Sequence, residues 1–351
     1  MRSWLERPEA QQLPDAATLH VNRTHYYQQV LHGYYQFDCV VSREEGVIRS
    51  TKFYVPEGSI YNQPTVILAL PENTEPWDFL VNSGWKALAD YYGLYMVMLE
   101  PKEDKIWGDL QEELHYFDAV SGDLNLRPMF CSFQANFYGV GYGKGADLLG
   151  YQARRAPRSY AALALLGTSG MTAEEKDFCE RTETRVEGVH CSEVQWPIWM
   201  TFASMNADTE RMVQYYRRAN HSKESGETTG TLTTYLSESG GTVDEEWCAK
   251  TMVDLDEWQN TINVDYSKRI LTTLFDGIYR YPGTNNGALR YAENIYSRGF
   301  HKFTAPVWGG YFEDKTDTYM REWYVYVPES APKSKIPAVF IFHGAGGSGD
   351  E

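Results

Sequence analysis

The apolar residues of this chain gather in short continuous runs, which are typical of strands buried on both faces of a sheet. The strands predicted in this way are 65–70, 94–101, 136–141, 160–167 and 196–204. Residues 47–55 (VIRSTKFYV) alternate between apolar and polar positions, which predicts a further strand that ends at Pro56.

Segments with helical spacing separate these strands. The helices predicted from that spacing are 77–93, 109–120, 144–157 and 209–219. Because strands and helices alternate, we expect an α/β fold with a mostly parallel sheet flanked by helices. Residues 1–30 give no strong element, residues 220–244 are expected to form a loop or insertion, and helical patterning returns at 254–280.

The strand–proline–turn–strand pattern of residues 47–70 returns near the end of the chain. The segment FYVPEGSIYNQPTVILALPEN aligns with WYVYVPESAPKSKIPAVFIFHGAGG, about 270 residues later. A single repeat at this distance indicates a second copy of a domain. We therefore expect an N-terminal extension (1–46), a first domain (47–299) and the start of a second, truncated domain (300–351).

The strand expected at 336–343 (AVFIF and its flanks) would expose unpaired backbone groups and apolar side chains if nothing covered it. We expect it to be covered by the remainder of a second domain, by a partner chain, or by strand exchange in a homodimer.

A glycine-rich turn joins the strand at 136–141 to the helix at 144–157. Its residues are Gly141, Tyr142, Gly143, Lys144 and Gly145. Serine hydrolases of the α/β-hydrolase type carry their nucleophile in this strand–turn–helix context, in the pattern G-x-S-x-G. Gly143 stands at the serine position, and glycine has no side chain that can attack an acyl carbon.

The same turn has two other interpretations. A nucleotide-binding loop should close the first βαβ unit, whereas this turn comes after two strands and two helices. Lys144 could be taken for a general base, yet it begins a helix that is expected to face solvent. We expect neither cofactor binding nor local catalysis here.

A second part of the hydrolytic machinery differs between the two copies. In the second copy, His343, Gly344, Ala345, Gly346 and Gly347 follow the apolar strand, and their backbone N–H groups could hold a developing oxyanion. The corresponding place in the first copy reads Leu70-Pro71-Glu72-Asn73 (70–73). Proline has no N–H, and the glutamate would repel an oxyanion, so this part is also missing.

The acid and base of a catalytic triad have no clear candidates. Asp208 follows the strand at 196–204, where a triad acid is expected, but a charge at the beginning of a helix explains it better. Neither His190 nor His221 stands in a place that suggests a general base, and a structural role is the better interpretation of His301.

Charge and cysteine content limit the classes of partner. The formal net charge is −16, which argues against nucleic acid and anionic membranes as partners. No run of 18 apolar residues predicts a membrane span, and the first 20 residues lack the apolar core of an export signal. The five cysteines form no CxxC pair, so we expect free thiols, no metal site and a cytoplasmic location.

These motifs resemble the polyhydroxybutyrate-depolymerase and feruloyl-esterase-like branch of the α/β-hydrolases. The segment REWYVYVP through IPAVFIFHGAGGSGDE resembles the start of that family's catalytic domain, and the resemblance implies that the HGxGG segment forms the oxyanion hole. Residues 47–219 resemble the same family more loosely and depart from it at Gly143 and at Leu70-Pro71. The resemblance implies a degenerate first domain in a two-domain serine esterase.

Three functions remain open. The first is a non-catalytic hydrolase-like domain that supports an esterase domain or holds its ester or polysaccharide substrate. The second is an esterase whose nucleophilic serine is replaced at Gly143. The third is a polymer- or carbohydrate-binding module, because aromatic residues make up 15% of the chain. The tryptophans considered for it are Trp77, Trp85, Trp107, Trp196 and Trp199, of which the last two are expected in the core.

Overall fold

A computed structural model gives the structure of this 351-residue chain. It describes residues 7–14, 32–42, 46–57, 63–102, 104–126, 137–239, 249–281, 288–291, 300–308, 318–328, 330–332, 334 and 336–342. Within these ranges, no helix combines the length and the apolar character needed to cross a bilayer.

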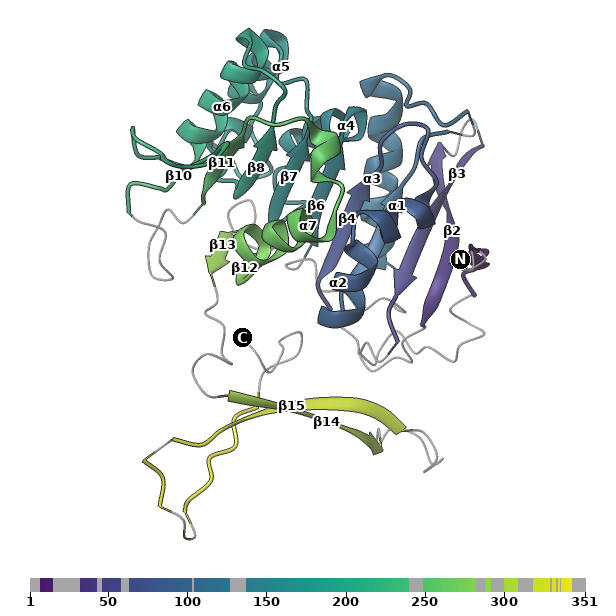
Figure 1. Ribbon diagram of the computed structural model, residues 1–351, viewed down its shortest axis with the longest axis vertical. Helices are drawn as coiled ribbons and strands as arrows, with labels where there is room; N and C mark the ends of the chain where they lie inside the picture. The colour runs from purple at the N-terminus through teal and green to yellow at the C-terminus, as the bar shows by residue number, and fades with distance from the viewer. Residues whose placement is uncertain are drawn as a thin grey trace.

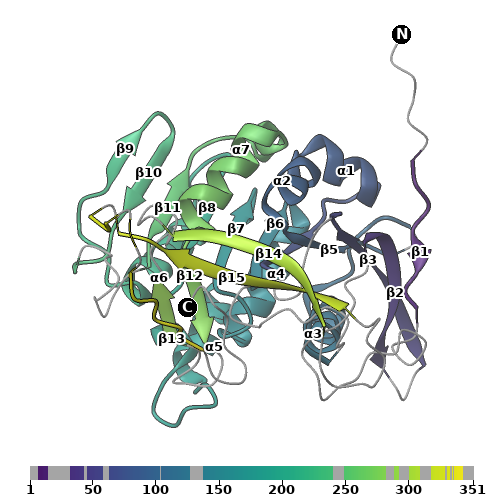
Figure 2. The same ribbon diagram turned by 90° about the horizontal axis from the view of Figure 1, so that it is seen from below.

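A twisted sheet of eleven strands forms the centre of the molecule, in the order β1-β2-β3-β5-β4-β6-β7-β8-β11-β10-β9. The strands are β1 (Gln11–Gln12), β2 (Gly33–Ser42), β3 (Val47–Val55), β4 (Thr65–Ala69), β5 (Tyr95–Leu99), β6 (Phe137–Tyr142), β7 (Ala162–Leu166), β8 (Ile198–Thr201), β9 (Glu227–Thr229), β10 (Leu232–Tyr235) and β11 (Thr251–Asp254). Figure 2 shows β9 and β10 at one end of the sheet and β1 and β2 at the other.

The middle of the sheet is parallel, antiparallel pairs flank it on both sides, and the short edge strand β1 is parallel to β2. Strands β5, β4, β6, β7, β8 and β11 run parallel to their neighbours in that order. Strand β3 is antiparallel to both β2 and β5, and the β9–β10 hairpin is antiparallel to β11. The mostly parallel sheet predicted from the sequence is confirmed.

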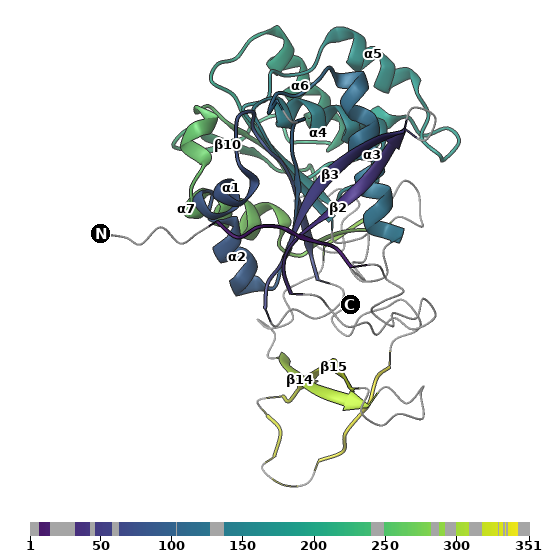
Figure 3. The same cartoon turned by 90° about the vertical axis from the view of Figure 1, so that its right-hand side faces the viewer.

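Helices cover both faces of this sheet (Figures 1 and 3). The helices are α1 (Pro76–Asn82), α2 (Trp85–Tyr92), α3 (Leu110–Leu126), α4 (Lys144–Arg155), α5 (Ala173–Arg181), α6 (Ala207–Ala219) and α7 (Val264–Ile270), with short turns at Cys191–Glu193, Trp258–Thr261 and Leu271–Phe275. One core lies between the sheet and α3, α4 and α6, and the other lies under α1, α2 and α7. Every residue of β4, β5, β6, β7 and β8 is buried, which explains their continuous apolar runs.

The single helix predicted at 77–93 is wrong, because the chain forms two helices there. Gly84 separates α1 from α2 with a left-handed φ of 80°. A Cβ at Gly84 would lie 2.4 Å from the Cα of Val264, at the start of α7, so this glycine allows α7 to pack close to the break.

Three other segments also differ from the expectations. The loop expected at 220–244 contains the β9–β10 hairpin, and the helical region expected at 254–280 follows strand β11 and contains only α7 and two short turns before β12 (Ile278–Tyr281). Strands β1 and β2 begin before residue 47 and belong to the sheet. Short strands rich in threonine and glutamate are stabilised by their neighbours in the sheet, which local patterning does not reveal.

Two small antiparallel pairs complete the described elements. Strand β12 pairs with β13 (Ala288–Tyr291), and β14 (Phe300–Trp308) pairs with β15 (Thr318–Tyr326). The strand expected at 336–343 is not found, since residues 336–342 have no regular secondary structure and Val339, Phe340, Ile341 and Phe342 are exposed. A strand needs a neighbour for its backbone groups, and no described strand pairs with this segment.

Candidate active site at the carboxyl edge of the sheet

The turn after β6 has a sharp and unusual backbone. Gly143 lies between β6 and α4 with φ 55° and ψ −125°, a conformation that side-chain-bearing residues rarely adopt. Eight strands of the sheet lie side by side in the order β2-β3-β5-β4-β6-β7-β8-β11, which is the strand order of the α/β-hydrolase sheet. The turn follows β6, the fifth strand in this order. The chain has the α/β-hydrolase fold. By strand order, the turn at Gly143 is where the sequence predicts the elbow, and Gly143 stands where a nucleophile is expected in it.

The two outer glycines of the elbow allow strand and helix to approach closely. A Cβ at Gly141 would lie 2.4 Å from the Cα of Ala146 in the first turn of α4. A Cβ at Gly145 would lie 2.6 Å from the carbonyl oxygen of Ala69 at the end of β4. Both positions therefore require glycine for steric reasons, whereas at Gly143 a Cβ would meet only a side chain at ordinary contact distance.

The two remaining elbow residues point in different directions. Tyr142 is buried, and its hydroxyl accepts a hydrogen bond from Trp85 Nε1 at 2.9 Å. Burial raises the pKa of Tyr142 to about 12, so the hydroxyl stays protonated at neutral pH. Lys144 is exposed at the start of α4, as the sequence suggested.

Trp258 covers the position where a nucleophile would stand. A Cβ at Gly143 would lie 3.4 Å from Trp258 Cζ2, and a Cβ at Gly167, after β7, would lie only 2.3 Å from Trp258 Cδ1. The indole ring therefore rests on two glycines at the ends of adjacent strands. A hydroxyl at position 143 would face an aromatic carbon surface.

Trp258 was not among the residues that the sequence suggested. It follows β11, and in hydrolases of this fold the triad base follows the acid in chain order. The segment from Leu255 to Asn263 contains no histidine. The signal that could have revealed it is the short strand β11 (Thr251–Asp254), which the sequence analysis did not assign before the helical region expected from residue 254.

The loop that carries Trp258 is held by its own polar residues. Asp256 Oδ1 accepts hydrogen bonds from Glu257 N and Asn260 Nδ2, both at 2.8 Å. Thr261 Oγ1 donates to the carbonyl oxygen of Trp258 at 2.6 Å. These bonds fix the short helical turn and hence the position of the indole.

The loop after β4 offers little to an oxyanion. The N–H of Leu70 donates to the carbonyl oxygen of Leu99 at 3.0 Å, and the N–H of Asn73 donates to that of Lys105 at 2.9 Å. Pro71 has no N–H, and a carboxylate oxygen of Glu72 accepts from Trp107 N. These backbone donors are therefore committed within the protein.

The segment after β8 forms a helix cap. The side chain of Asn206 accepts hydrogen bonds from the N–H groups of Asp208 and Thr209 at the start of α6. Asp208 lies in the first turn of this helix, is half exposed, and pairs with Arg211. The negative charge of Asp208 therefore lies where it stabilises the N-terminus of α6.

The histidines lie elsewhere. His190 caps a short turn before β8, where it contacts Glu193, and His221 follows the C-terminus of α6. Both line a cavity of about 430 Å³ together with Glu180 and Arg218. Because they precede β8 or follow the C-terminus of α6, they stand at the amino edge of the parallel strands, opposite Gly143. His301 lies on β14.

Other predicted features are placed as follows. The loop of the second copy, His343 to Gly347, lies outside the described residues, as do Cys131 and Cys248.

Cys179 and Cys191 are buried free thiols, and burial raises the pKa of Cys179 to about 11. In the ranges that the structure describes, no cluster of histidine, cysteine and acidic residues could hold a metal ion.

Four of the five candidate binding tryptophans belong to the interior. Trp85, Trp107, Trp196 and Trp199 are buried, which confirms the expectation for the last two. Trp77 is half-buried at the start of α1 and lines a cavity of about 1180 Å³. It is therefore the only one of these five that can offer its ring to a ligand.

Comparisons with known proteins give similarity of fold alone. No protein-family model and no curated protein matches the chain. Solved structures with a similar fold include an acetyl xylan esterase from Aspergillus awamori (12% identity, 58% of this chain and 86% of that one, TM-score 0.41). Others are an S-formylglutathione hydrolase from Agrobacterium tumefaciens (12%, 55% and 84%, TM-score 0.36) and LpqC, a poly(3-hydroxybutyrate) depolymerase from Bordetella parapertussis (15%, 55% and 75%, TM-score 0.37).

Proposed function

We propose that the sheet domain of this chain is a non-catalytic α/β-hydrolase-like domain of a two-domain carboxylic-ester hydrolase. In this proposal it supports a serine esterase domain of the polyhydroxybutyrate-depolymerase or feruloyl-esterase-like kind, or the binding of its substrate. The observation that carries the proposal is the absence of a side chain at Gly143 beneath the ring of Trp258. Acyl transfer needs a nucleophile and space for the carbonyl carbon next to it.

The surroundings of the elbow support the same conclusion. The donors of an oxyanion hole would come from the residue after the nucleophile and from the loop after β4. In that loop, Pro71 has no N–H, and the N–H groups of Leu70 and Asn73 are bound to backbone carbonyls. Replacing Gly143 by serine would not free the N–H groups of Leu70 and Asn73, which weighs against an esterase that differs from an active one only at residue 143.

The two hairpins of the chain support a two-domain arrangement. Tyr54, two residues before Pro56, pairs with Tyr34 across β2 and β3. Tyr326, two residues before Pro328, pairs with Phe300 across β14 and β15. The aligned tyrosines thus have aromatic partners in both hairpins, and Phe300 stacks on Tyr326 at 5.1 Å between ring centroids.

The exposed residues 339–342 need a cover in this proposal. We propose the remainder of a C-terminal esterase domain, with a partner chain or strand exchange in a homodimer as the other arrangements. Four adjacent apolar side chains, each at least 79% exposed, favour such a cover because exposed apolar segments of this kind associate. The free thiols of Cys179 and Cys191 favour a reducing compartment such as the cytoplasm.

A fluorophosphonate probe tests the non-catalytic assignment directly. We expect residues 1–351 to form no covalent adduct with the probe and to hydrolyse p-nitrophenyl acetate no faster than buffer. The Gly143→Ser variant serves as the comparison, and we expect it to remain unlabelled as well. An adduct on any residue of the eleven-stranded sheet or its loops in the unmodified chain would refute the proposal, and strong labelling of Gly143→Ser would favour the lost-serine interpretation.

A further inference from the structure

A large cavity opens at the carboxyl edge of the sheet, two strands away from the elbow. We call it the Trp77 cavity, and its volume is about 1180 Å³. Strands β2 and β3, the loop after β5, the start of α1 and residues 7–10 line it. Small-molecule sites have volumes of about 300–1,000 Å³, so this cavity has room for a ligand of several linked units.

Aromatic rings form one wall of the Trp77 cavity. The ring centroid of Trp77 lies 4.9 Å from that of Tyr34 and 5.8 Å from that of Tyr54, so two tyrosines hold the indole in place. Trp77 and Tyr34 both line the cavity. A fixed and half-exposed indole provides a flat apolar surface at a low entropic cost.

Polar side chains of β2, β3 and the loop after β5 also line the cavity. Lys52 Nζ lies 2.9 Å from Gln36 Oε1 and 3.3 Å from Glu100 Oε1, and Ser50 Oγ lies within 3.4 Å of the same amine. Donors and acceptors therefore alternate over a short distance. Burial raises the pKa of Glu100, although Lys52 opposes this effect.

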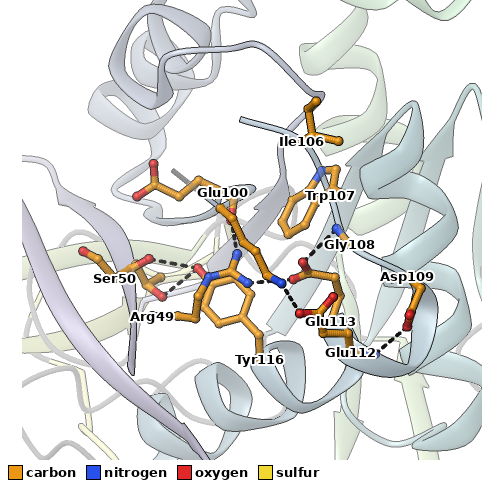
Figure 4. Close-up of polar contacts among 12 residues, drawn as sticks. Arg49, Ser50, Glu100, Ile106, Trp107, Gly108, Asp109, Glu112, Glu113 and Tyr116 are labelled. Carbon is orange, nitrogen blue, oxygen red and sulfur yellow. Dashed lines mark hydrogen bonds and ion pairs between the residues drawn. The ribbon is translucent and has the colours of Figure 1, made fainter. Parts of the chain in front are cut away.

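Among the lining residues, Arg49 is immobilised by a buried ion pair with Glu113 (Figure 4). Its Nη1 donates to Glu113 Oε2 at 2.9 Å, and its Nη2 donates to the carbonyl oxygen of Glu100 at 2.7 Å. Its guanidinium carbon lies 4.2 Å from the ring centroid of Tyr116. The network holds the strand ends in place, so the polar lining is preorganised before any ligand arrives.

The charges of the Trp77 cavity nearly cancel. The basic residues on its wall are Arg7, Arg49, Lys52, Lys102 and Lys105, and the acidic residues are Glu9, Glu75, Glu100 and Asp104. Each of the basic residues has an acidic neighbour in an ion pair. An anionic ligand would have to compete with the acidic partners of these basic residues, whereas a neutral ligand rich in hydroxyl groups would not.

We infer that the Trp77 cavity binds a neutral oligosaccharide. A sugar ring has an apolar face of C–H groups that packs on an indole, while its hydroxyls both donate and accept hydrogen bonds. The lining of the cavity offers an indole together with neighbouring Lys, Gln, Ser and Glu side chains. This inference does not depend on the elbow, so the ester assay and the binding test can fail separately.

Isothermal titration calorimetry of the full chain tests the inference with three neutral probes, namely xylohexaose, cellohexaose and maltohexaose. We expect at least one probe to bind with a dissociation constant of about 1 mM or lower. The Trp77→Ala variant should weaken that binding at least tenfold. The Tyr91→Ala variant is the matched control, because Tyr91 is 81% exposed outside the cavity, and it should bind as the wild type does.

Several results would overturn the inference. They are absence of binding to all three probes, equal weakening by Tyr91→Ala and Trp77→Ala, and tighter binding of oligogalacturonate than of every neutral probe. If Trp77→Ala fails to give a cooperative thermal transition, Gln36→Ala replaces it, since Gln36 lines the cavity. Gln36→Ala should weaken binding at least threefold, and unchanged affinity in that variant would also refute the proposed site.

Discussion

Two positions along the same edge of the sheet have opposite character. At the ends of β6 and β7, the indole of Trp258 lies against Gly143 and Gly167. This apolar ring fills the space next to residue 143. At the beginning of β3 and the end of β5, an ion-pair network surrounds a large open cavity. The sheet thus has a sharp strand–turn–helix backbone with no side chain at residue 143, and a large cavity lies further along the same edge. This difference illustrates that a fold does not imply a function, because function depends on individual sites.

The largest expected effect comes from the buried ion pair behind the cavity. Glu113→Gln leaves Arg49 without its charge partner, and because Glu113 is fully buried we expect the free energy of unfolding to fall by about 3 kcal/mol. Urea denaturation measures this change. The neighbouring Glu112→Gln is the control, since Glu112 is half exposed, and it should change stability by less than about 1 kcal/mol. Equal effects of the two variants would mean that the network does not support the cavity wall.

The elbow can be tested by adding single methyl groups. Gly145→Ala places a Cβ 2.6 Å from the carbonyl oxygen of Ala69, so backbone must move, and we expect a loss of about 2–3 kcal/mol. In Gly143→Ala the new Cβ would lie 3.4 Å from Trp258 Cζ2, an ordinary contact distance. Only the positive φ of this residue would strain the backbone, so we expect the free energy of unfolding to fall by about 1 kcal/mol. Thermal unfolding measures the loss of stability in both variants, and we expect the larger loss in Gly145→Ala. A larger loss in Gly143→Ala would contradict the close packing that we describe at the elbow.

Removal of the covering ring separates stability from activity. Trp258→Ala should lower the free energy of unfolding by about 1–2 kcal/mol, less than for a fully buried tryptophan because Trp258 is half exposed. It should not create ester hydrolysis, since Gly143 still lacks a hydroxyl. Denaturant titration and a p-nitrophenyl acetate assay are run on the same preparation. Turnover by Trp258→Ala would reveal a nucleophile other than residue 143.

The smallest effect concerns the pH dependence of stability near the cavity. The folded-state pKa of Glu100 is raised above its ordinary value of 4.5 by burial, so the folded protein binds its proton more tightly than the unfolded chain. Stability should therefore decrease as pH rises from 4.5 through the folded-state pKa. Glu100→Gln should remove this contribution. The free energy of unfolding of the variant minus that of the wild type should therefore be larger at pH 7 than at pH 4, by less than about 1 kcal/mol. Melting temperatures at both pH values test the sign.

Much of the fold could be predicted from local pattern, and the failures have physical reasons. The continuous apolar runs of β4, β5 and β7 identify buried parallel strands, because no polar position is tolerated between two layers of helices. Strand β11 and the β9–β10 hairpin were missed, since their stability comes from neighbouring strands. The helix expected at 77–93 was wrong because α7, almost 200 residues later, packs against Gly84.

The sequence by itself determined the α/β layout and the absence of a side chain at position 143, since the order of apolar runs and the identity of one residue are local properties. Only the tertiary structure decided that Trp258 covers Gly143 and that Trp77, alone among the five candidate tryptophans, faces a cavity. Those facts depend on which strand ends meet at one edge of the sheet. Such contacts between distant residues leave no periodic pattern in the chain.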